Sequence, residues 1–520
     1  MRSGWTGVGA MAVAIISLAM LHPWTQGAKG PSAVGPVAHA GADAHGYPKV
    51  SRAQQTQAIL RRSDTAAFRV NSPASTYWAG VVEGFYGPTW SNRSTIQVFK
   101  FMTQHHLNTF VYAPKNDAYL RASWNQPYPK SALTHLAQLA IAARGLHINF
   151  VVSISPGLSI VYSNPKDRAQ LLMKINQLKS IGVQSFMLSF DDIPETLDPT
   201  DQAVYGNNLG AAQSALANYV LKQETTVDPA FHMIFTPTVY WGDHANPYWD
   251  NLRQDLNPRV PVVWTGPRVL STTITVQDVQ LARQALGHPL VIWDNYPVND
   301  YSYVMYHRPQ LFMGPLVGRQ AGVIHRVQGY LMNPMLQPLA SEVALWTAGT
   351  FLHDPVGYKP SLSWTHAIAG IGGKSDAAFK IFCEDSSASY LDPNATNTVA
   401  PEVSAFWQTY QQHGNLKSTS LYHAFQAMSQ VNTQLAQGLN PRLYQEIKPW
   451  AQQLSLEGST GVAVIGLLEH SLEGGSISSS RVNAVAATAS QVVHAPNTLG
   501  VTAAVDQWIS QAQTMPAFSG

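Results

Sequence analysis

The sequence predicts an α/β protein, a (β/α)8 (TIM) barrel followed by an all-helical domain, and three observations support this prediction. Between residues 76 and 345 the chain carries eight short apolar runs, separated by segments with helical periodicity. Most of these runs end in polar residues or glycine, as expected where barrel strands converge on one rim. After residue 345 the strand signals stop, and helical periodicity continues through residues 346–520.

The eight apolar runs are expected to be the barrel strands in chain order. They are residues 79–83, 108–112, 149–154, 185–190, 233–236, 260–265, 290–294 and 329–332. Segments such as 131–144 and 168–181 have the amphipathic spacing of helices that pack outside a barrel. Strands that alternate with helices indicate parallel β/α units, and eight units of this kind predict a closed barrel.

The first 75 residues are expected to contain a targeting segment. Arg2 supplies a positive charge, and residues 8–21 form an apolar run of the length typical of a signal peptide. Ala38-His39-Ala40 offers a cleavage site, so residues 1–40 are predicted to be the signal peptide and 41–75 a linker or short lead-in. The sequence therefore predicts secretion, and an uncleaved N-terminal membrane anchor is the alternative.

Charge and cysteine content limit the classes of partner. Charged residues make up 12% of the chain and its net charge is +2, so nothing favours a nucleic-acid or anionic-membrane partner. The single cysteine, Cys383, excludes an intrachain disulfide and a thiolate metal cluster. We expect it to be a small buried hydrophobic residue in a helix.

Asp191 and Asp192 follow the fourth apolar run, and their residue type permits two interpretations. Aspartates at such a position cap helices or line solvated turns. Alternatively, two carboxylates in one site repel each other, so one holds a proton while the other ionises, which supplies an acid and a base together. A metal site is less favoured because no His-x-His or His-Glu-x-x-His cluster accompanies the pair. We expect neither a metal nor a cofactor.

Segments at the strand ends resemble glycoside hydrolase family 84, the β-N-acetylglucosaminidases that include O-GlcNAcases and bacterial proteins often named hyaluronidases. The similar segments, in family order across about residues 79–335, are 80–87 (GVVEGFYG), 112–115 (YAPK), 155–157 (SPG), 190–193 (FDDI), 237–240 (PTVY), 264–267 (WTGP), 293–295 (WDN) with 299–300 (ND), and 331–334 (LMNP). The number and order of these segments make the resemblance specific.

The resemblance implies a reaction in which the substrate supplies its own nucleophile. The 2-acetamido oxygen attacks the anomeric carbon to form an oxazoline, and the configuration is retained. Asp191 would orient and polarise the acetamido N–H. Asp192 would protonate the leaving oxygen and then activate water. Tyr240 would donate a hydrogen bond to the acetamido oxygen.

The resemblance also implies the residues that bind the sugar. They are Gly84, Lys115, Thr265, Trp293, Asn295, Asp300 and Asn333. The Gly84 backbone and Lys115 would contact a ring hydroxyl, and Asn295 would help to hold the acetamido group. Asp300 and Asn333 would bind the hydroxyls at the non-reducing end. Thr265 and Trp293 would line the pocket. Trp293 is also the best candidate in the sequence for stacking on a sugar ring.

Two departures from the family pattern bear on substrate preference. The family usually has Lys-Asp-Asp after the second strand, where this chain has Lys115-Asn116-Asp117. Thr236 stands where animal relatives carry cysteine.

The expected function is therefore a retaining exo-β-N-acetylglucosaminidase that acts on glycans or glycoconjugates containing N-acetylglucosamine. The alternatives are an endo-acting hyaluronidase and a catalytically silent carbohydrate-binding barrel. The silent barrel would need a broken catalytic set, whereas Asp191, Asp192 and Tyr240 are all present. Glycoprotein, peptidoglycan fragments, chitooligosaccharides and hyaluronan products all present the same terminal sugar.

Overall fold

The computed structural model describes residues 77–307, 309–395, 397–495 and 503–518. From Tyr77 onward the described residues form one compact unit. The expected signal peptide (1–40) and linker (41–75) lie outside the described residues. Within the described ranges, no helix has the length and apolar character needed to cross a membrane.

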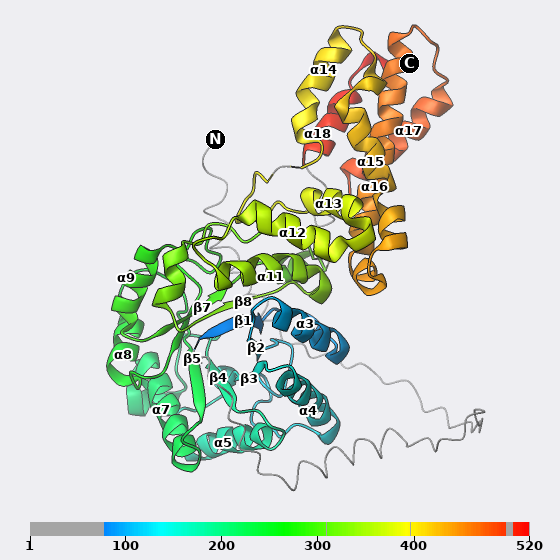
Figure 1. The fold of residues 1–520 in the computed structure, drawn as a ribbon. Helices are drawn as coiled ribbons and strands as arrows, with labels where there is room; N and C mark the ends of the chain where they lie inside the picture. The colour runs from blue at the N-terminus through cyan, green and yellow to red at the C-terminus, as the bar shows by residue number, and fades with distance from the viewer. Residues whose placement is uncertain (1–76, 308, 396, 496–502, 519–520) are drawn as a thin grey trace, which may run out of the picture. The chain divides into compact units, whose positions relative to one another are not determined.

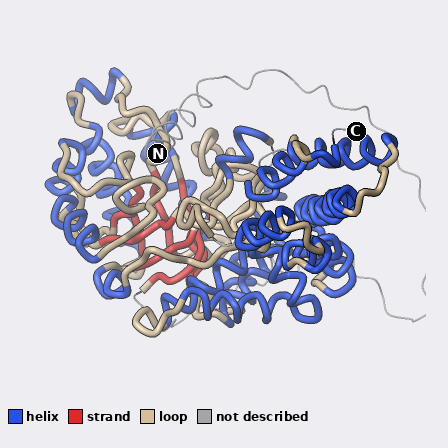
Figure 2. Tube along the Cα trace, turned by 90° about the horizontal axis from the view of Figure 1, so that it is seen from above, coloured by secondary structure: helices blue, strands red, loops and turns tan. Residues whose placement is uncertain are grey.

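Eight parallel strands close into a barrel in chain order, and the last strand pairs with the first. The strands are β1 (Trp78–Glu83), β2 (Thr109–Tyr112), β3 (Asn149–Ile154), β4 (Ser185–Ser189), β5 (His232–Thr236), β6 (Val262–Trp264), β7 (Leu290–Asp294) and β8 (Gly329–Met332). The predicted (β/α)8 barrel is confirmed, and each expected run overlaps its strand with ends shifted by two residues or fewer. Figure 2 shows the strands in red, grouped together and flanked by helices.

Helices follow the strands and cover the outside of the barrel (Figure 1). They are α3 (Asn92–Gln104), α4 (Lys130–Gly145), α5 (Pro165–Lys179), α6 (Pro199–Tyr205), α7 (Leu209–Val227), α8 (Pro247–Asp255), α9 (Val276–Leu286), α10 (Asp300–Tyr306) and α11 (Pro338–His353). Local sequence sets their starts. Asn164 caps α5 by accepting a hydrogen bond from the Lys166 amide, and Thr275 and Asp278 form a capping box at α9.

The strands are buried on both faces, which explains why they are nearly continuous apolar runs. Alternate side chains fill the interior of the barrel, and the others pack against the outer helices. The buried interior residues are Val82, Val111, Ala113, Val151, Met187, Ile234, Val263, Val291, Trp293 and Leu331. Because the interior is filled, only the strand ends and the loops that follow them are free to form a site.

Beyond the barrel the described chain is helical and contains no strand. The helices are α12 (Pro360–Gly372), α13 (Asp376–Asp385), α14 (Val403–Gln411), α15 (Ser420–Gly438), α16 (Pro441–Leu472), α17 (Ser479–Val493) and α18 (Ala503–Ala512). They share a second apolar core, which includes Cys383 as a free, buried thiol on α13. Helix α11 runs across residue 345, because it is the last helix packed on the barrel and contacts α3, β1 and β8.

Helix α16 is tied to the barrel by polar contacts. The Glu446 carboxylate accepts hydrogen bonds from the Leu339 and Ala340 amides, at 2.8 and 3.2 Å, in the first turn of α11. Glu342 lies one turn further along α11, with 9% of its surface exposed and its Oε1 without a hydrogen-bond partner among the described residues. Burial raises the pKa of Glu342 to about 8, and the neighbouring charge of Glu446 adds to the shift.

We expect the protein to lose stability as pH rises from about 4.5 toward 8, because the Glu342 carboxyl is harder to ionise in the folded state than in the unfolded state. Glu342→Gln keeps the shape but removes this ionisation, and should raise the free energy of unfolding near pH 8 by about 1–3 kcal/mol. Denaturant unfolding of both proteins at several pH values measures the effect. A variant whose pH dependence is as steep as that of the natural chain would contradict this assignment.

Candidate active site

The two adjacent aspartates lie on the loop that directly follows β4, at the carboxyl ends of the strands. Asp192 has a φ of +55°, the left-handed region that non-glycine residues seldom occupy. The Arg121 guanidinium donates a 2.8 Å hydrogen bond from Nη2 to the Asp192 main-chain oxygen. Such strain persists where the surroundings impose it, and it is concentrated at functional sites.

The Asp192 carboxylate is held by two phenols. Tyr240 donates a 2.9 Å hydrogen bond to Oδ1, and Tyr86 donates a 3.0 Å hydrogen bond to Oδ2. The Lys115 ammonium lies 3.5 Å from the same Oδ2. Burial alone would raise the pKa of Asp192, but Lys115, Arg121 and the two phenols outweigh it and hold the pKa below its usual value.

Asp191 forms an ion pair with Lys115 through Oδ2 and is 5% exposed. Its other oxygen, Oδ1, is buried and has no hydrogen-bond partner among the described residues. A buried carboxylate oxygen without a donor is costly, so a ligand that brought a donor to this oxygen would bind favourably. An N–H group placed beside Asp191 would satisfy this oxygen.

A second group of candidate residues gathers around β1, β7 and β8. The Trp293 ring lies so close to the Gly84 backbone that a Cβ at Gly84 would come within 2.1 Å of it. The Trp293 Nε1 donates to Asn295 Oδ1 at 2.9 Å, and the Asn333 amide donates to the same oxygen at 3.0 Å. Asn333 Oδ1 in turn lies 3.4 Å from the Gly84 nitrogen, which donates to it. The close approach of ring and backbone explains why position 84 needs glycine.

Asp300 joins the two groups. It is the first residue of α10, and its Oδ2 accepts a 2.9 Å hydrogen bond from the backbone nitrogen of Tyr86, whose phenol contacts Asp192. Burial raises the pKa of Asp300 to about 6, and the charge of Asp192 adds to the shift. The Lys115 ammonium lies 5.8 Å from the ring centres of both Tyr86 and Trp293, so it stands between the two groups.

Thr265 is joined by hydrogen bonds to the backbone near the site and not to either aspartate. Its amide donates a 2.9 Å hydrogen bond to the main-chain oxygen of Tyr240, and its hydroxyl donates to the main-chain oxygen of Arg268. Thr236, at the position where animal relatives carry cysteine, is buried and accepts a hydrogen bond from the Ser189 hydroxyl. Asn116 is exposed.

Two other carboxylates at strand ends are used for structure. Glu83 is fully buried and accepts a 2.8 Å hydrogen bond from the Trp90 amide. Asp294 is bound by Arg319 through two hydrogen bonds of 2.7 and 2.8 Å and also accepts one from the Tyr330 phenol. Both oxygens of Asp294 are bound by the surrounding fold, whereas Oε2 of Glu83 is buried without a hydrogen-bond partner among the described residues, and burial raises the pKa of this carboxyl to about 8.

Comparison with known proteins identifies the family. A family model described as beta-N-acetylglucosaminidase matches residues 79–384, more than half of the chain. The chain belongs to this family of glycoside hydrolases. A second model, the post-catalytic domain of bacterial family 84 enzymes, matches residues 395–509. The predicted resemblance is thereby confirmed.

Similar proteins include two curated O-GlcNAcases and two proteins of solved structure. Protein O-GlcNAcase from Rattus norvegicus and that from Mus musculus are each 35% identical over 288 residues, 54% of this chain but only 30% of the relative's length. A solved mutant of the Thermobaculum terrenum O-GlcNAc hydrolase aligns with a TM-score of 0.73 and 28% identity, over 84% of this chain and 94% of that one. The structure of CpGH84B aligns with a TM-score of 0.71 and 26% identity, over 84% and 76% respectively.

Two residues that contact Asp192 in the candidate site were not singled out from the sequence. Tyr86 lies inside the quoted segment 80–87, so the signal was present but no role was assigned to the phenol. Arg121 lies outside every quoted segment, and nothing in its spacing indicates that it reaches the Asp192 backbone. Among the described residues, those of the site included, no group of three or more His, Cys, Asp or Glu side chains is placed to hold a metal ion.

Proposed function

We propose that the enzyme is a retaining exo-β-N-acetylglucosaminidase in which the acetamido group of the substrate is the nucleophile. The observation that carries this proposal is the buried, unpartnered Oδ1 of Asp191, beside an ion pair with Lys115. An acetamido N–H is the donor that this oxygen lacks. Accepting it would orient the carbonyl oxygen toward the anomeric carbon and stabilise the positive charge of the forming oxazoline.

The placement of the two aspartates argues against a nucleophilic carboxylate. A retaining enzyme that uses its own nucleophile has two carboxylates on opposite sides of the scissile bond. Asp191 and Asp192 are consecutive and both approach the single ammonium of Lys115, at Oδ2 in each case. They would therefore lie on the same side of the scissile bond. This suits one carboxylate that polarises the acetamido N–H beside a second that acts as the acid.

Asp192 is the proposed proton donor, and its pKa must rise before it can act. In the unliganded site Lys115, Tyr86 and Tyr240 stabilise the carboxylate form. A substrate that takes the Tyr240 hydrogen bond on its acetamido oxygen, and that draws the Lys115 ammonium to a ring hydroxyl, weakens two of these stabilising contacts. The pKa of Asp192 then rises, and the acid can protonate the leaving oxygen. After departure its carboxylate activates water.

Tyr86→Phe should move the basic limb of the pH profile of kcat/KM upward by about one pH unit for substrates with poor leaving groups. The variant removes a donor that stabilises the Asp192 anion, so the protonated form persists to higher pH. Tyr306→Phe, at an exposed phenol, is the matched control. A basic limb that stays in place or moves downward would contradict this role of Tyr86.

Exo action is proposed because Asp300 and Asn333 provide polar groups around the part of the site that would hold the non-reducing end of the sugar. Their carboxylate and amide suit the free hydroxyls of a terminal sugar, and a further sugar at one of those hydroxyls would displace a hydrogen bond to a buried group. The substrate class is therefore a terminal β-linked N-acetylglucosamine of a glycan or glycoconjugate.

Turnover of a chromogenic β-N-acetylglucosaminide, compared with degradation of intact hyaluronan, tests this function. We expect hydrolysis of the small glycoside and no depolymerisation of the polymer. Polymer degradation without turnover of the glycoside would favour the endo-acting alternative, and binding without turnover of either would favour the silent barrel.

A further inference from the structure

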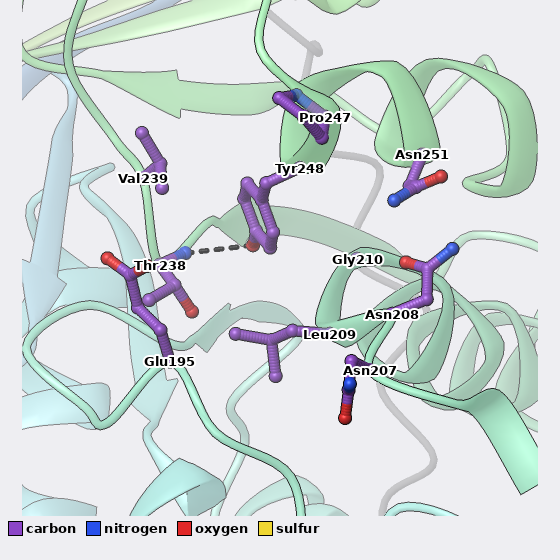
Figure 3. Close-up of a pocket in the computed structure, with 10 residues that line it drawn as sticks. All are labelled: Glu195, Asn207, Asn208, Leu209, Gly210, Thr238, Val239, Pro247, Tyr248 and Asn251. Carbon is purple, nitrogen blue, oxygen red and sulfur yellow. Dashed lines mark hydrogen bonds between the residues drawn. The ribbon is translucent and has the colours of Figure 1, made fainter. Parts of the chain in front are cut away.

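A polar cavity of about 180 Å³ lies next to the loop that carries the two aspartates. Its walls come from the loops after β4 and β5 and from the first turns of α7 and α8 (Figure 3). The lining residues are Glu195, Asn207, Asn208, Leu209, Gly210, Thr238, Val239, Pro247, Tyr248 and Asn251. None of the residues assigned above to the reaction lines this cavity.

The lining is rich in hydrogen-bonding groups that the fold leaves unused. Glu195 stands beside Thr238 on one side, the amides of Asn207 and Asn251 stand on the other, and the Tyr248 ring lies between them (Figure 3). The side chains of Glu195, Asn207 and Asn251 make no hydrogen bond to any described residue, and the exposed Glu195 and Asn207 face solvent, so all three are available to a ligand. Acceptors and donors on opposite sides of a ring suit a ligand with hydroxyls around its edge and an apolar face.

The wall of the cavity is held in place by its own hydrogen bonds. The Thr238 amide donates to the Tyr248 hydroxyl at 2.9 Å, and the Gln213 amide donates to the Thr238 hydroxyl at 2.8 Å. The Trp249 Nε1 donates to the Val239 main-chain oxygen at 2.7 Å. The cavity is therefore formed before any ligand arrives, which lowers the entropic cost of binding.

Its position relates the cavity to the leaving group. Glu195 follows Asp192 by three residues, so their backbones are separated by at most about 11 Å. Thr238 precedes Tyr240, which contacts the Asp192 carboxylate, by two residues. The atom that Asp192 would protonate is the leaving oxygen. The group attached to that oxygen would therefore begin beside Asp192, on the side of the site where the cavity lies.

We propose that this cavity is a binding site for a neutral, polyhydroxylated sugar residue of the leaving group. The inference rests on the proposed function, and it narrows the substrate to terminal N-acetylglucosamine carried by an uncharged oligosaccharide. Glu195 disfavours a uronate at this position, because the cavity lining offers no basic side chain to balance two carboxylates. A chitooligosaccharide therefore fits better than a hyaluronan oligosaccharide.

Turnover of chitotriose and of an aryl β-N-acetylglucosaminide by Glu195→Gln, Asn207→Ala and Asn251→Ala tests the proposal. Each change removes one or two hydrogen bonds, so kcat/KM for chitotriose should fall by about twofold to tenfold. The aryl group carries no hydroxyls for these side chains to bind, so the aryl glycoside should be hydrolysed by each variant at close to the rate of the natural chain. Glu473→Gln, at the exposed carboxylate of the residue that caps the C-terminus of α16, is the matched control. Thermal unfolding of each variant confirms that it is folded.

Glu195→Gln should also increase turnover of a substrate in which N-acetylglucosamine is linked to glucuronate, relative to chitotriose. Equal losses on chitotriose and the aryl glycoside, or no loss on either, would overturn the proposal. A loss confined to a serine-linked N-acetylglucosamine peptide would also overturn it, by assigning the cavity to polypeptide. If the natural chain does not hydrolyse the aryl glycoside at all, the proposed function itself is wrong, and the inference falls with it.

Discussion

Asp192→Asn is expected to lower kcat/KM by about 10²–10⁴-fold for substrates with poor leaving groups, and far less for activated aryl glycosides. The amide cannot donate the proton that an alkoxide leaving group requires, whereas a nitrophenolate leaves without one. Asp191→Asn should slow both substrates, because an amide does not stabilise the positive charge of the forming oxazoline. The contrast separates two carboxylates that are adjacent in sequence and share Lys115.

Steady-state kinetics of both variants on a matched pair of substrates, an alkyl and a nitrophenyl β-N-acetylglucosaminide, measures this contrast. The substitutions preserve side-chain size, so the fold should be retained, and thermal unfolding provides the check. Equal losses for both variants on both substrates would contradict the assigned roles.

Asp300→Ala is expected to reduce turnover of a monosaccharide glycoside by orders of magnitude, although Asp300 takes no part in proton transfer. The proposed hydrogen bonds from the terminal sugar would be lost, and so would the anchor of the Tyr86 backbone. The loss of hydrogen bonds to a charged group costs several kcal/mol in total. Asp300→Asn keeps an acceptor for the Tyr86 backbone nitrogen and should retain more activity than Asp300→Ala. The difference between the two variants separates the effect of anchoring Tyr86 from the effect of the carboxylate charge.

The proposed role of Asp300, together with that of Asn333, also leads to a test of exo against endo action. If Asp300 and Asn333 bind the hydroxyls of a terminal sugar, an internal residue of a polymer cannot enter the site. The enzyme should then release free N-acetylglucosamine without an early fall in polymer viscosity. Rapid viscosity loss on intact hyaluronan would overturn the exo assignment.

The barrel could be predicted because burial on both faces leaves a strong mark on each strand. Continuous apolar runs that end in polar residues locate all eight strands to within two residues. The location of the candidate site followed from the same pattern, since the carboxyl ends of parallel strands meet on one rim. This is why Asp191, Lys115 and Asn333, which are far apart in sequence and follow different strands, lie on the same rim.

The contacts within the site could not be predicted in the same way. Glu83 and Asp294 also stand at strand ends, and only the structure shows that Trp90 and Arg319 use their carboxylates. The left-handed backbone of Asp192 depends on packing between distant loops, which spacing does not encode. Helical periodicity around residue 345 indicates a helix there. It does not reveal that this helix, α11, packs on the barrel through α3, β1 and β8.

The most direct test of the central claim is the dependence of kcat/KM on the basicity of the acetamido oxygen. Aryl β-glucosaminides carrying N-acetyl, N-fluoroacetyl, N-difluoroacetyl and N-trifluoroacetyl groups differ in little else, and fluorine withdraws electron density from the carbonyl. If the acetamido oxygen is the nucleophile beside Asp191 and Tyr240, kcat/KM should fall steeply with each added fluorine. A kcat/KM that does not change across the series would contradict substrate-assisted catalysis.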